Sequence, residues 1–293
     1  MLKKINIIGC GYIGKRIAHS LKANNSSLCC FVQSEKSRDI CTSMGLQSMQ
    51  FDLDEHNASI DEAGKSLLVN SSIAYLAPPQ RWGEKDTRME HFISVLETLS
   101  APPSKILLIS TTGVYGDCKG EWIDEQRTTR PKVDRARRRL SAETQLKIYC
   151  EKFEIQYVVF RVPGIYAPDK LPVKRITSGE PIVKAADSGY TNRIHADDLS
   201  AFCVEALVGE VATGIYNCCD GAPSTMNDYF VKVADALQLA RPKEISLLQA
   251  QQELSPGMLS YLAESKRITN KKLLSHFKTR FKYENLEAGL KSL

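Results

Sequence analysis

The sequence predicts an α/β protein built on a doubly wound parallel sheet, with a small C-terminal α/β cap. Three features carry this prediction. Short apolar runs alternate with amphipathic helical patterns over residues 1–165, a glycine-rich turn joins the first run to the first helical pattern, and the alternation becomes irregular after Pro163. Apolar strands joined by right-handed helical crossovers form a parallel sheet covered on both faces. We expect a first domain over 1–165 and a second over 166–293, with part of 191–222 returning to the first.

The expected elements follow one another along the chain. Apolar runs predict strands at 4–9, 28–34, 72–78, 105–111, 156–164 and 214–221. Apolar positions spaced three and four residues apart predict helices at 14–25, 39–45, 87–99, 137–153 and 225–239. Within 192–209 we expect a strand or loop followed by a helix. This alternation of strands and helices is the basis for the doubly wound sheet.

The composition argues against a membrane span and against a nucleic-acid partner. The 293 residues carry a net charge of +5, and no apolar run approaches the ~18 residues of a membrane-spanning helix. No nucleic-acid motif accompanies this mild basic excess, which suits an anionic small ligand. The nine cysteines include no C-x-x-C spacing. We therefore expect reduced, buried thiols, no metal and a cytoplasmic location.

The segment after the first strand predicts a dinucleotide-binding turn. It reads G-C-G-Y-I-G, a G-x-G-x-x-G pattern between a strand and a helix. The first glycine permits a tight turn, the second lets a pyrophosphate approach the backbone, and the third lets the helix pack close to the strand. The helix N-terminus offers free N–H groups and the positive end of its dipole to the phosphates. The predicted cofactor contacts are Gly9, Gly11, Tyr12, Ile13 and Gly14.

The end of the second strand bears on the choice between NAD(H) and NADP(H). Proteins that bind NAD usually place an acidic residue there, which binds the ribose 2′-hydroxyl. Here Gln33 and Ser34 occupy this place, and Lys36 follows closely. A polar, cation-rich edge tolerates a 2′-phosphate, so we favour NADP(H) over NAD(H).

Two further segments are expected beside the cofactor. Asp52 and Leu53 follow the next short strand, where they either meet the adenine edge or form a turn. Ala77 and Pro78 end the strand expected at 72–78, and we include them among the cofactor-binding residues.

Four segments of the chain occur in a recognisable order. They read KILLISTTGVYGD, FRVPGIYAP, NRIHADDLS and SKRITNKKLL. This series resembles the extended short-chain dehydrogenase/reductase family, in its nucleotide-sugar epimerase/dehydratase branch. The resemblance covers nearly the whole chain and implies an NAD(P)-binding Rossmann domain with a substrate-side cap. The glycine turn departs from the usual family pattern G-x-x-G-x-x-G, because the chain has Ile8 and carries Gly9 instead.

The resemblance implies roles for residues near the expected nicotinamide site. Thr111 falls on the family's catalytic hydroxyl position, and Thr112 takes its place if the register shifts by one residue. Tyr115 either donates a proton alone or merely packs at the strand end. Pro163 and Ile165 match the loop that approaches the nicotinamide.

The resemblance also shows that a catalytic pair is missing. The family carries Tyr-x-x-x-Lys on the helix after the V-Y-G strand, where the Tyr exchanges a proton and the Lys holds the ribose. Alignment on Glu143 puts Arg135 and Arg139 at these positions. Arg139 can still hold a ribose or phosphate, whereas Arg135 cannot exchange a proton near neutral pH. Arg135, Arg138 and Thr112 are predicted to contact a substrate or anion, with a solvated helix face as the alternative for the arginines.

The sequence therefore predicts an NAD(P)-binding, oxidoreductase-like protein that transfers hydride on an anionic small molecule without the usual Tyr/Lys pair. One alternative is a non-catalytic NADP(H)-binding or redox-sensing protein. Another is a nucleotide-sugar epimerase or dehydratase. Turnover itself is left open, since no proton donor is identified. By the family resemblance the protein is a monomer or a homodimer, and its partner is an anionic small molecule or none.

Overall fold

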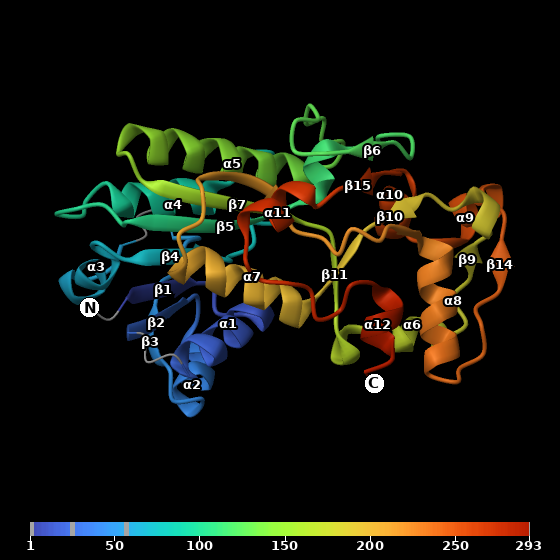
Figure 1. Ribbon diagram of the computed structural model, residues 1–293, viewed down its shortest axis with the longest axis horizontal. Coiled ribbons are helices and arrows are strands. Elements are labelled where there is room, and N and C mark those ends of the chain that lie inside the picture. Colours follow the sequence, from blue (N-terminus) through green and yellow to red (C-terminus); the bar gives the residue numbers. More distant parts are fainter. Residues whose placement is uncertain (1–2, 24–26, 56–58, 293) are drawn as a thin grey trace.

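The predicted parallel sheet is confirmed by a computed structural model, which describes residues 3–23, 27–55 and 59–292 (Figure 1). Seven parallel strands lie in the order β12-β7-β5-β4-β1-β2-β3. Their bounds are β1 Lys4–Ile8, β2 Ser27–Val32, β3 Gln47–Gln50, β4 Ser72–Tyr75, β5 Lys105–Thr111, β7 Gln156–Val162 and β12 Gly214–Asn217. The strand order reverses between β1 and β4. Loops leaving the carboxyl ends of those two strands diverge, and a ligand crevice is expected there.

Helices cover both faces of the sheet, because the strands are apolar on both sides. Ile5 and Ile7 of β1 enter one core, and Ile8 enters the other. The helices over the first core are α1 Tyr12–Ala23, α2 Glu35–Ser43 and α7 Ala196–Val208. Those over the second are α3 Glu62–Leu68, α4 Thr87–Leu96 and α5 Asp134–Lys152. Figure 1 shows α5 above β7 and β5, and α2 below β3.

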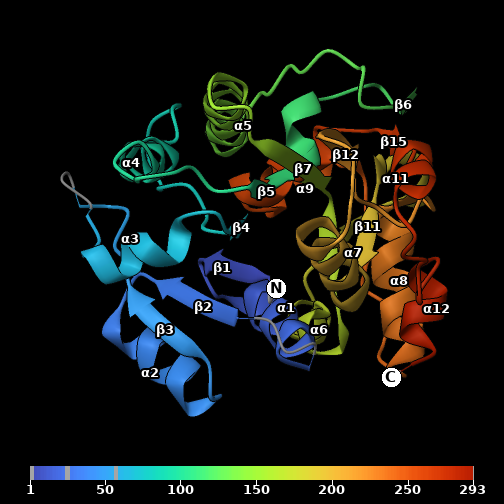
Figure 2. The same cartoon turned by 60° about the vertical axis from the view of Figure 1, so that its left-hand side comes forward.

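The cap is assembled from short elements that follow β7 (Figure 2). Its helices are α6 Val173–Thr177, α8 Met226–Ala236, α9 Leu247–Glu253, α10 Pro256–Leu262 and α12 Leu286–Leu290, with short 3-10 turns at Pro168–Lys170 and Ala185–Asp187. Its strand pairs are β8 Gly164–Tyr166 with β11 Arg193–His195, β10 Tyr190–Thr191 with β13 Ser224–Thr225, and β9 Ile182–Val183 with β14 Glu244–Ile245. A further pair joins β6 Trp122–Ile123 to β15 Arg267–Ile268, and α11 Lys271–His276 follows it.

The chain crosses between the sheet and the cap several times. After β11, α7 packs against α1 and β12 pairs with β7 as the outermost strand of the main sheet. The Asp198 carboxylate in α7 accepts hydrogen bonds from the backbone N–H groups of Lys282 and Tyr283, at 2.8 and 3.1 Å. These contacts tie the C-terminal segment to the helix that covers the sheet.

Several elements differ from the sequence prediction. α3 has little apolar periodicity and was not expected; it begins where the Asp61 side chain caps the N–H of Gly64 at 2.8 Å. A 3-10 turn, η1 Thr112–Tyr115, follows β5 directly. α1 ends at Ala23, and Asn24 and Asn25 of the helix expected at 14–25 lie outside the described residues.

Among the residues that the structure describes, no helix is both long and apolar enough to cross a membrane.

Candidate functional site

The glycine turn lies at the reversal point of the sheet, between β1 and α1. Gly9 has a φ of +90°, and a Cβ there would lie 2.7 Å from the backbone nitrogen of Ala77. A side chain at Gly9 would therefore collide with the loop after β4. A Cβ at Gly14 would lie 3.1 Å from the Gly9 carbonyl oxygen, so this glycine allows α1 to pack tightly against β1.

Gly11 is different, because no described atom beyond Gly11 and its two chain neighbours lies within 4 Å of the place where its Cβ would be. Its N–H donates to the carbonyl of Gly9 at 2.8 Å, and α1 begins at the next residue. The open space faces the N-terminus of a helix, which attracts anions through its free N–H groups and dipole. Gly9 and Gly14 are therefore required by the protein's own packing, whereas the Cβ position of Gly11 borders open space.

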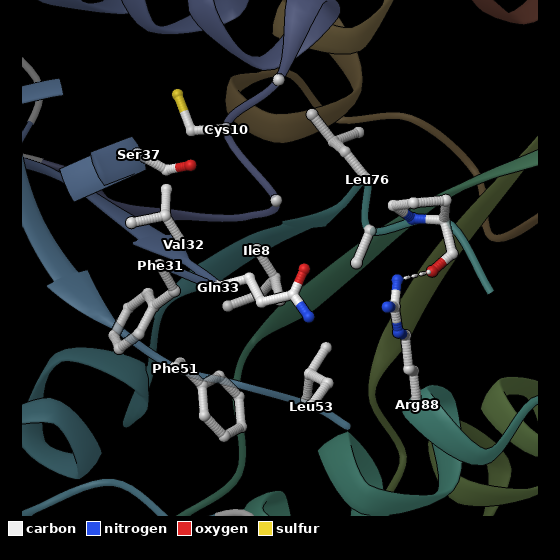
Figure 3. Close-up of a pocket in the computed structure, with 14 residues that line it drawn as sticks. Ile8, Cys10, Phe31, Val32, Gln33, Ser37, Phe51, Leu53, Leu76 and Arg88 are labelled. Carbon is white, nitrogen blue, oxygen red and sulfur yellow. Dashed lines mark hydrogen bonds between the residues drawn. The ribbon is translucent and has the colours of Figure 1, made fainter. Parts of the chain in front are cut away.

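A first cavity of about 220 Å³ opens beside this turn (Figure 3). Gly9 and Gly11 form one end of it, and Ala77 and Pro78 from the loop after β4 form a side. Apolar side chains make a slot at the carboxyl ends of β2 and β3: Phe31, Val32, Phe51 and Leu53. Such a slot suits a flat, apolar-faced group such as an adenine ring.

Polar groups occupy the far end of the first cavity. The Gln33 side chain points into the cavity in Figure 3 and donates to the carboxylates of Asp52 and Asp54, at 3.1 and 2.9 Å. Arg88 of α4 pairs with Asp54 and donates to the carbonyl of Pro78 at 2.8 Å. Asp52 also accepts the N–H of Asp54 at 2.9 Å, the geometry of a turn-forming aspartate. Both carboxylates at this end are thus engaged by protein donors.

The remaining predicted cofactor residues surround the first cavity without lining it. Ser34 caps α2 by accepting the N–H of Ser37, and it is Ser37 that lines the cavity. Lys36 is exposed in the first turn of α2. Tyr12 hydrogen-bonds Asp169 and thereby links α1 to the cap, while Ile13 packs against the core. Sequence reasoning missed Arg88 and Ser37, since each reaches the cavity from a helix that carries no cofactor motif.

A second cavity, of about 370 Å³, lies between the sheet and the cap. The loop after β4 separates the two cavities, because Ala77 and Pro78 line the first and Pro79 lines the second. Thr111, Thr112 and Pro163 reach the second cavity from the carboxyl ends of β5 and β7. The cap contributes Asn192, Arg193, Tyr261 and Lys266. Ile165, half exposed on β8, lines neither cavity.

The hydroxyl residues after β5 separate into two environments. Thr111 and Thr112 line the second cavity, and the Thr111 hydroxyl oxygen accepts the N–H of Gly113 at 3.2 Å. Tyr115 turns the other way: it is 1% exposed, and its hydroxyl donates to the Asn217 side chain at 2.7 Å. Burial raises the pKa of Tyr115 to about 12. The 3-10 turn therefore places Tyr115 in a closed core, which corresponds to the packing alternative of the sequence prediction.

Of the three predicted arginines of α5, Arg135 and Arg139 line the second cavity and Arg138 does not. Arg135 lines the second cavity, with its guanidinium 4.4 Å from the centre of the Tyr261 ring. Arg139 also lines this cavity and donates to the carbonyl of Ala77 at 3.1 Å. Burial lowers the pKa of Arg139. Arg138 instead donates to the carbonyl of Gly83 in the loop before α4, and it does not line the second cavity.

Arg193 is a buried cation that sequence reasoning did not select. It is 7% exposed, and none of the ion pairs between described residues includes it. Its guanidinium lies 3.6 Å from the centre of the Tyr229 ring, and its Nη2 donates to the Thr191 hydroxyl at 3.1 Å. Its Nε has no hydrogen-bond partner among the described residues. Burial lowers the pKa of Arg193. A buried guanidinium without a carboxylate partner is costly, and an anion in the second cavity would offset that cost.

Asp220 is a buried acid close to Arg193, and it predicts a pH dependence of stability. Burial raises the pKa of Asp220 to about 7 from an ordinary value of 3.8, and its Oδ2 has no hydrogen-bond partner within the described part of the chain. The folded state therefore holds this proton more tightly than the unfolded state, and the associated stability is lost as the pH rises through about 7.

Asp220→Asn should remove this dependence, because the amide oxygen can still accept the N–H of Ala222. We expect wild type to lose about 2–3 kcal/mol of unfolding free energy between pH 5 and pH 9 that the variant retains, measured by urea denaturation. The exposed control Asp39→Asn should follow wild type. Parallel profiles for wild type and Asp220→Asn would show that Asp220 is not the group responsible.

Comparisons with known proteins identify the family and the shared fold. The model of a family described as the NAD dependent epimerase/dehydratase family matches residues 5–219. Protein YeeZ of Escherichia coli K12 is 23% identical over 250 residues, which cover 83% of this chain and 86% of that protein.

Two solved structures share the fold over nearly their whole length. A functionally unknown conserved protein from Silicibacter pomeroyi superposes with a TM-score of 0.81 at 22% identity, covering 98% of this chain and 96% of that one. The human epimerase family protein SDR39U1, solved with NADPH, superposes with a TM-score of 0.74 at 15% identity, covering 98% of each chain. With a family model that matches most of its length, the chain belongs to the NAD dependent epimerase/dehydratase family.

Proposed function

We propose that the protein binds a pyridine dinucleotide across the two cavities and acts on an anionic small molecule in the second. The observation that carries this proposal is that an open glycine turn and the buried Arg193 lie on opposite sides of the loop 76–79. No ion pair between described residues includes Arg193. The first element suits a pyrophosphate, and the second suits an anionic substrate. When bound, the dinucleotide would supply or accept a hydride.

The chain's own residues would orient the dinucleotide from both sides of the loop after β4. The adenine end would occupy the apolar slot of the first cavity, with the pyrophosphate against the N–H groups that begin α1. Arg139 reaches the Ala77 carbonyl from the second cavity, so its remaining N–H groups are placed to hold the ribose next to the nicotinamide. This is the role that the family resemblance assigns to the missing Lys.

Three cations favour an anionic substrate in the second cavity: Arg135, Arg193 and Lys266. Lys266 is 6% exposed and pairs with Glu264, whereas no described ion pair includes Arg135 or Arg193. Planar guanidinium groups bind carboxylate and phosphate oxygens in a bidentate manner. Thr111 would position the substrate oxygen, since its hydroxyl accepts from Gly113 and can donate its own proton into the cavity.

NADP(H) is the preferred form in this proposal. Ser37 and Gln33 line the far end of the first cavity, and Lys36 is exposed beside them. The nearby carboxylates of Asp52 and Asp54 already accept hydrogen bonds from Gln33, and Asp54 also pairs with Arg88. A 2′-phosphate would thus meet hydroxyl, amide and ammonium groups at this edge.

Lys36→Glu should weaken NADPH binding about 10-fold and change NADH binding less than about 2-fold, because only NADPH brings a 2′-phosphate to this edge. Fluorescence titration of both nucleotides measures the two dissociation constants. The control Lys243→Glu reverses the charge of an exposed lysine in the cap and should leave both constants unchanged. Equal losses for NADH and NADPH would remove Lys36 as the source of the preference.

The proposed binding is tested by titrating wild-type protein with NADPH and NADH and following the nicotinamide fluorescence. We expect saturable binding of both nucleotides, with NADPH the tighter. If neither nucleotide binds, the proposed function is wrong.

A second candidate function is binding without turnover, as in a redox-sensing protein. The observation that favours it is that Arg135 and Arg139 line the second cavity. The family resemblance aligns these two arginines with the family's proton donor and its helper. A screen of anionic carbonyl compounds with NADPH separates the two functions. Oxidation of NADPH by any of them supports the enzyme, and tight binding without turnover across the screen supports the sensor.

A further inference from the structure

Three cysteine sulfurs meet behind the glycine turn. Cys10 lies in the turn, Cys30 on β2 and Cys41 on α2, and their Sγ atoms all lie within 4.8 Å of one another. The three side chains are 6%, 0% and 1% exposed. Sequence spacing does not indicate this group, because the residues are far apart in the chain and are brought together only by the β1-α1-β2-α2 unit.

We infer that this group, named here the three-sulfur site, binds a soft monovalent metal ion, Cu(I). The donor atoms decide the class of metal, since thiolates select soft ions and disfavour the hard, oxygen-seeking Mg²⁺ and Ca²⁺. Structural zinc sites take four protein ligands, whereas the described residues supply three sulfurs. Three ligands around one ion suit Cu(I), which accepts trigonal coordination by sulfur.

The geometry needs little rearrangement. An ion at about 2.3 Å from each of three sulfurs holds those sulfurs about 4 Å apart. The observed separations, all within 4.8 Å, exceed this by less than 1 Å. Rotation of the cysteine side chains, or a small shift of the turn at Cys10, closes the difference.

The site also has a compensating charge. Cys10 is among the residues that line the first cavity, but its side chain is 6% exposed, and Figure 3 shows its sulfur pointing away from Gln33 and Ile8. Entry of an ion therefore requires a shift of the turn at Cys10. Binding of Cu(I) to three thiolates releases their three protons and leaves a net charge of −2. Lys15 acts electrostatically on Cys10 and Cys41, and the N-terminus of α1 adds the positive end of its dipole.

The same helix N-terminus serves the dinucleotide in the proposed function, and this next consequence rests on that proposal. A metal-thiolate group and a pyrophosphate are both anionic, and Cys10 stands between Gly9 and Gly11. Each should therefore weaken the binding of the other by the same factor. Filling the three-sulfur site with Cu(I) is expected to lower NADPH affinity at least about 10-fold.

Metal binding is tested without any nucleotide, so that it succeeds or fails independently of the proposed function. Reduced protein is titrated with Cu(I) under anaerobic conditions in competition with a coloured Cu(I) chelator, and proton release is recorded. We expect one Cu(I) per chain, close to three protons released at pH 7, and a sulfur-to-copper absorption band in the ultraviolet.

Variants locate the ion. Cys30→Ala and Cys41→Ala should each lower Cu(I) affinity at least about 100-fold. Cys203→Ala removes an equally buried thiol from the same core and should leave Cu(I) binding unchanged. Circular dichroism shows whether each variant is folded. Titration of wild type with cadmium, whose thiolate complexes also absorb in the ultraviolet, gives a second measure of the same site.

Two results would overturn the inference. One is Cu(I) binding by wild type that is no tighter than binding by a folded Cys30→Ala or Cys41→Ala variant. The other is an equal loss of binding in Cys203→Ala, which would mean that the metal binds to thiols without regard to their arrangement.

Discussion

Replacing Gly11 with valine should abolish dinucleotide binding while leaving the fold intact, with affinity lowered at least about 100-fold. No described atom beyond Gly11 and its two chain neighbours lies within 4 Å of a Cβ at this position, so the valine side chain would extend into the space that we propose for the pyrophosphate. We expect the melting temperature of the free protein to change by less than about 2 °C.

The measurement is NADPH titration beside thermal unfolding. Gly257→Val is the matched control, because Gly257 also has free space around its Cβ position but lies in α10 of the cap. It should bind NADPH as wild type does. Gly9→Ala should instead destabilise the protein, since its Cβ would lie 2.7 Å from Ala77. Wild-type affinity in Gly11→Val would place the pyrophosphate elsewhere.

Arg193→Met is expected to have two opposite effects. The methionine removes a buried cation that has no carboxylate partner among the described residues, so the free protein should gain unfolding free energy in spite of the lost hydrogen bond to Thr191. The same change removes a charged ligand for the substrate. In the presence of saturating NADPH, affinity for inorganic phosphate as a probe anion should fall at least about 10-fold.

Arg161 provides the contrast that makes this prediction specific. It is 4% exposed, like Arg193 a buried arginine, but it pairs with Glu143 at 2.7 Å. Arg161→Met leaves that carboxylate buried without its partner and should cost about 3–5 kcal/mol. Urea denaturation compares the two variants. Destabilisation of both by similar amounts would mean that Arg193 is a structural cation, and phosphate binding that survives Arg193→Met would remove it from the anion site.

The sequence could predict those features that depend on local pattern. The parallel sheet follows from the alternation of apolar strands and amphipathic helices. The glycine turn follows from spacing between a strand and a helix, although only the structure separates Gly11, which borders open space, from Gly9 and Gly14, which are required by packing.

Features that depend on tertiary contacts could not be predicted in this way. The arginines Arg135, Arg138 and Arg139 are close in sequence, yet Arg138 donates to the carbonyl of Gly83 in the loop before α4, whereas the other two line the second cavity. No local pattern distinguishes Arg193 from its neighbours in the sequence. Its burial, and the absence of a partner for its Nε among the described residues, arise from the packing of the cap. The three-sulfur site likewise forms only when β2 and α2 fold against the turn.

The central claim is that one dinucleotide spans both cavities, with its pyrophosphate at Gly11 and its nicotinamide in the second cavity. A crystal structure of the protein with NADPH tests this most directly. We predict the pyrophosphate against the backbone at Gly11 and a ribose within hydrogen-bond distance of Arg139. We also predict that nicotinamide C4 faces the space between Thr111 and Arg193, where a substrate atom can approach it to about 3–3.5 Å. A nucleotide bound away from the glycine turn, or a nicotinamide directed away from the second cavity, would contradict the account.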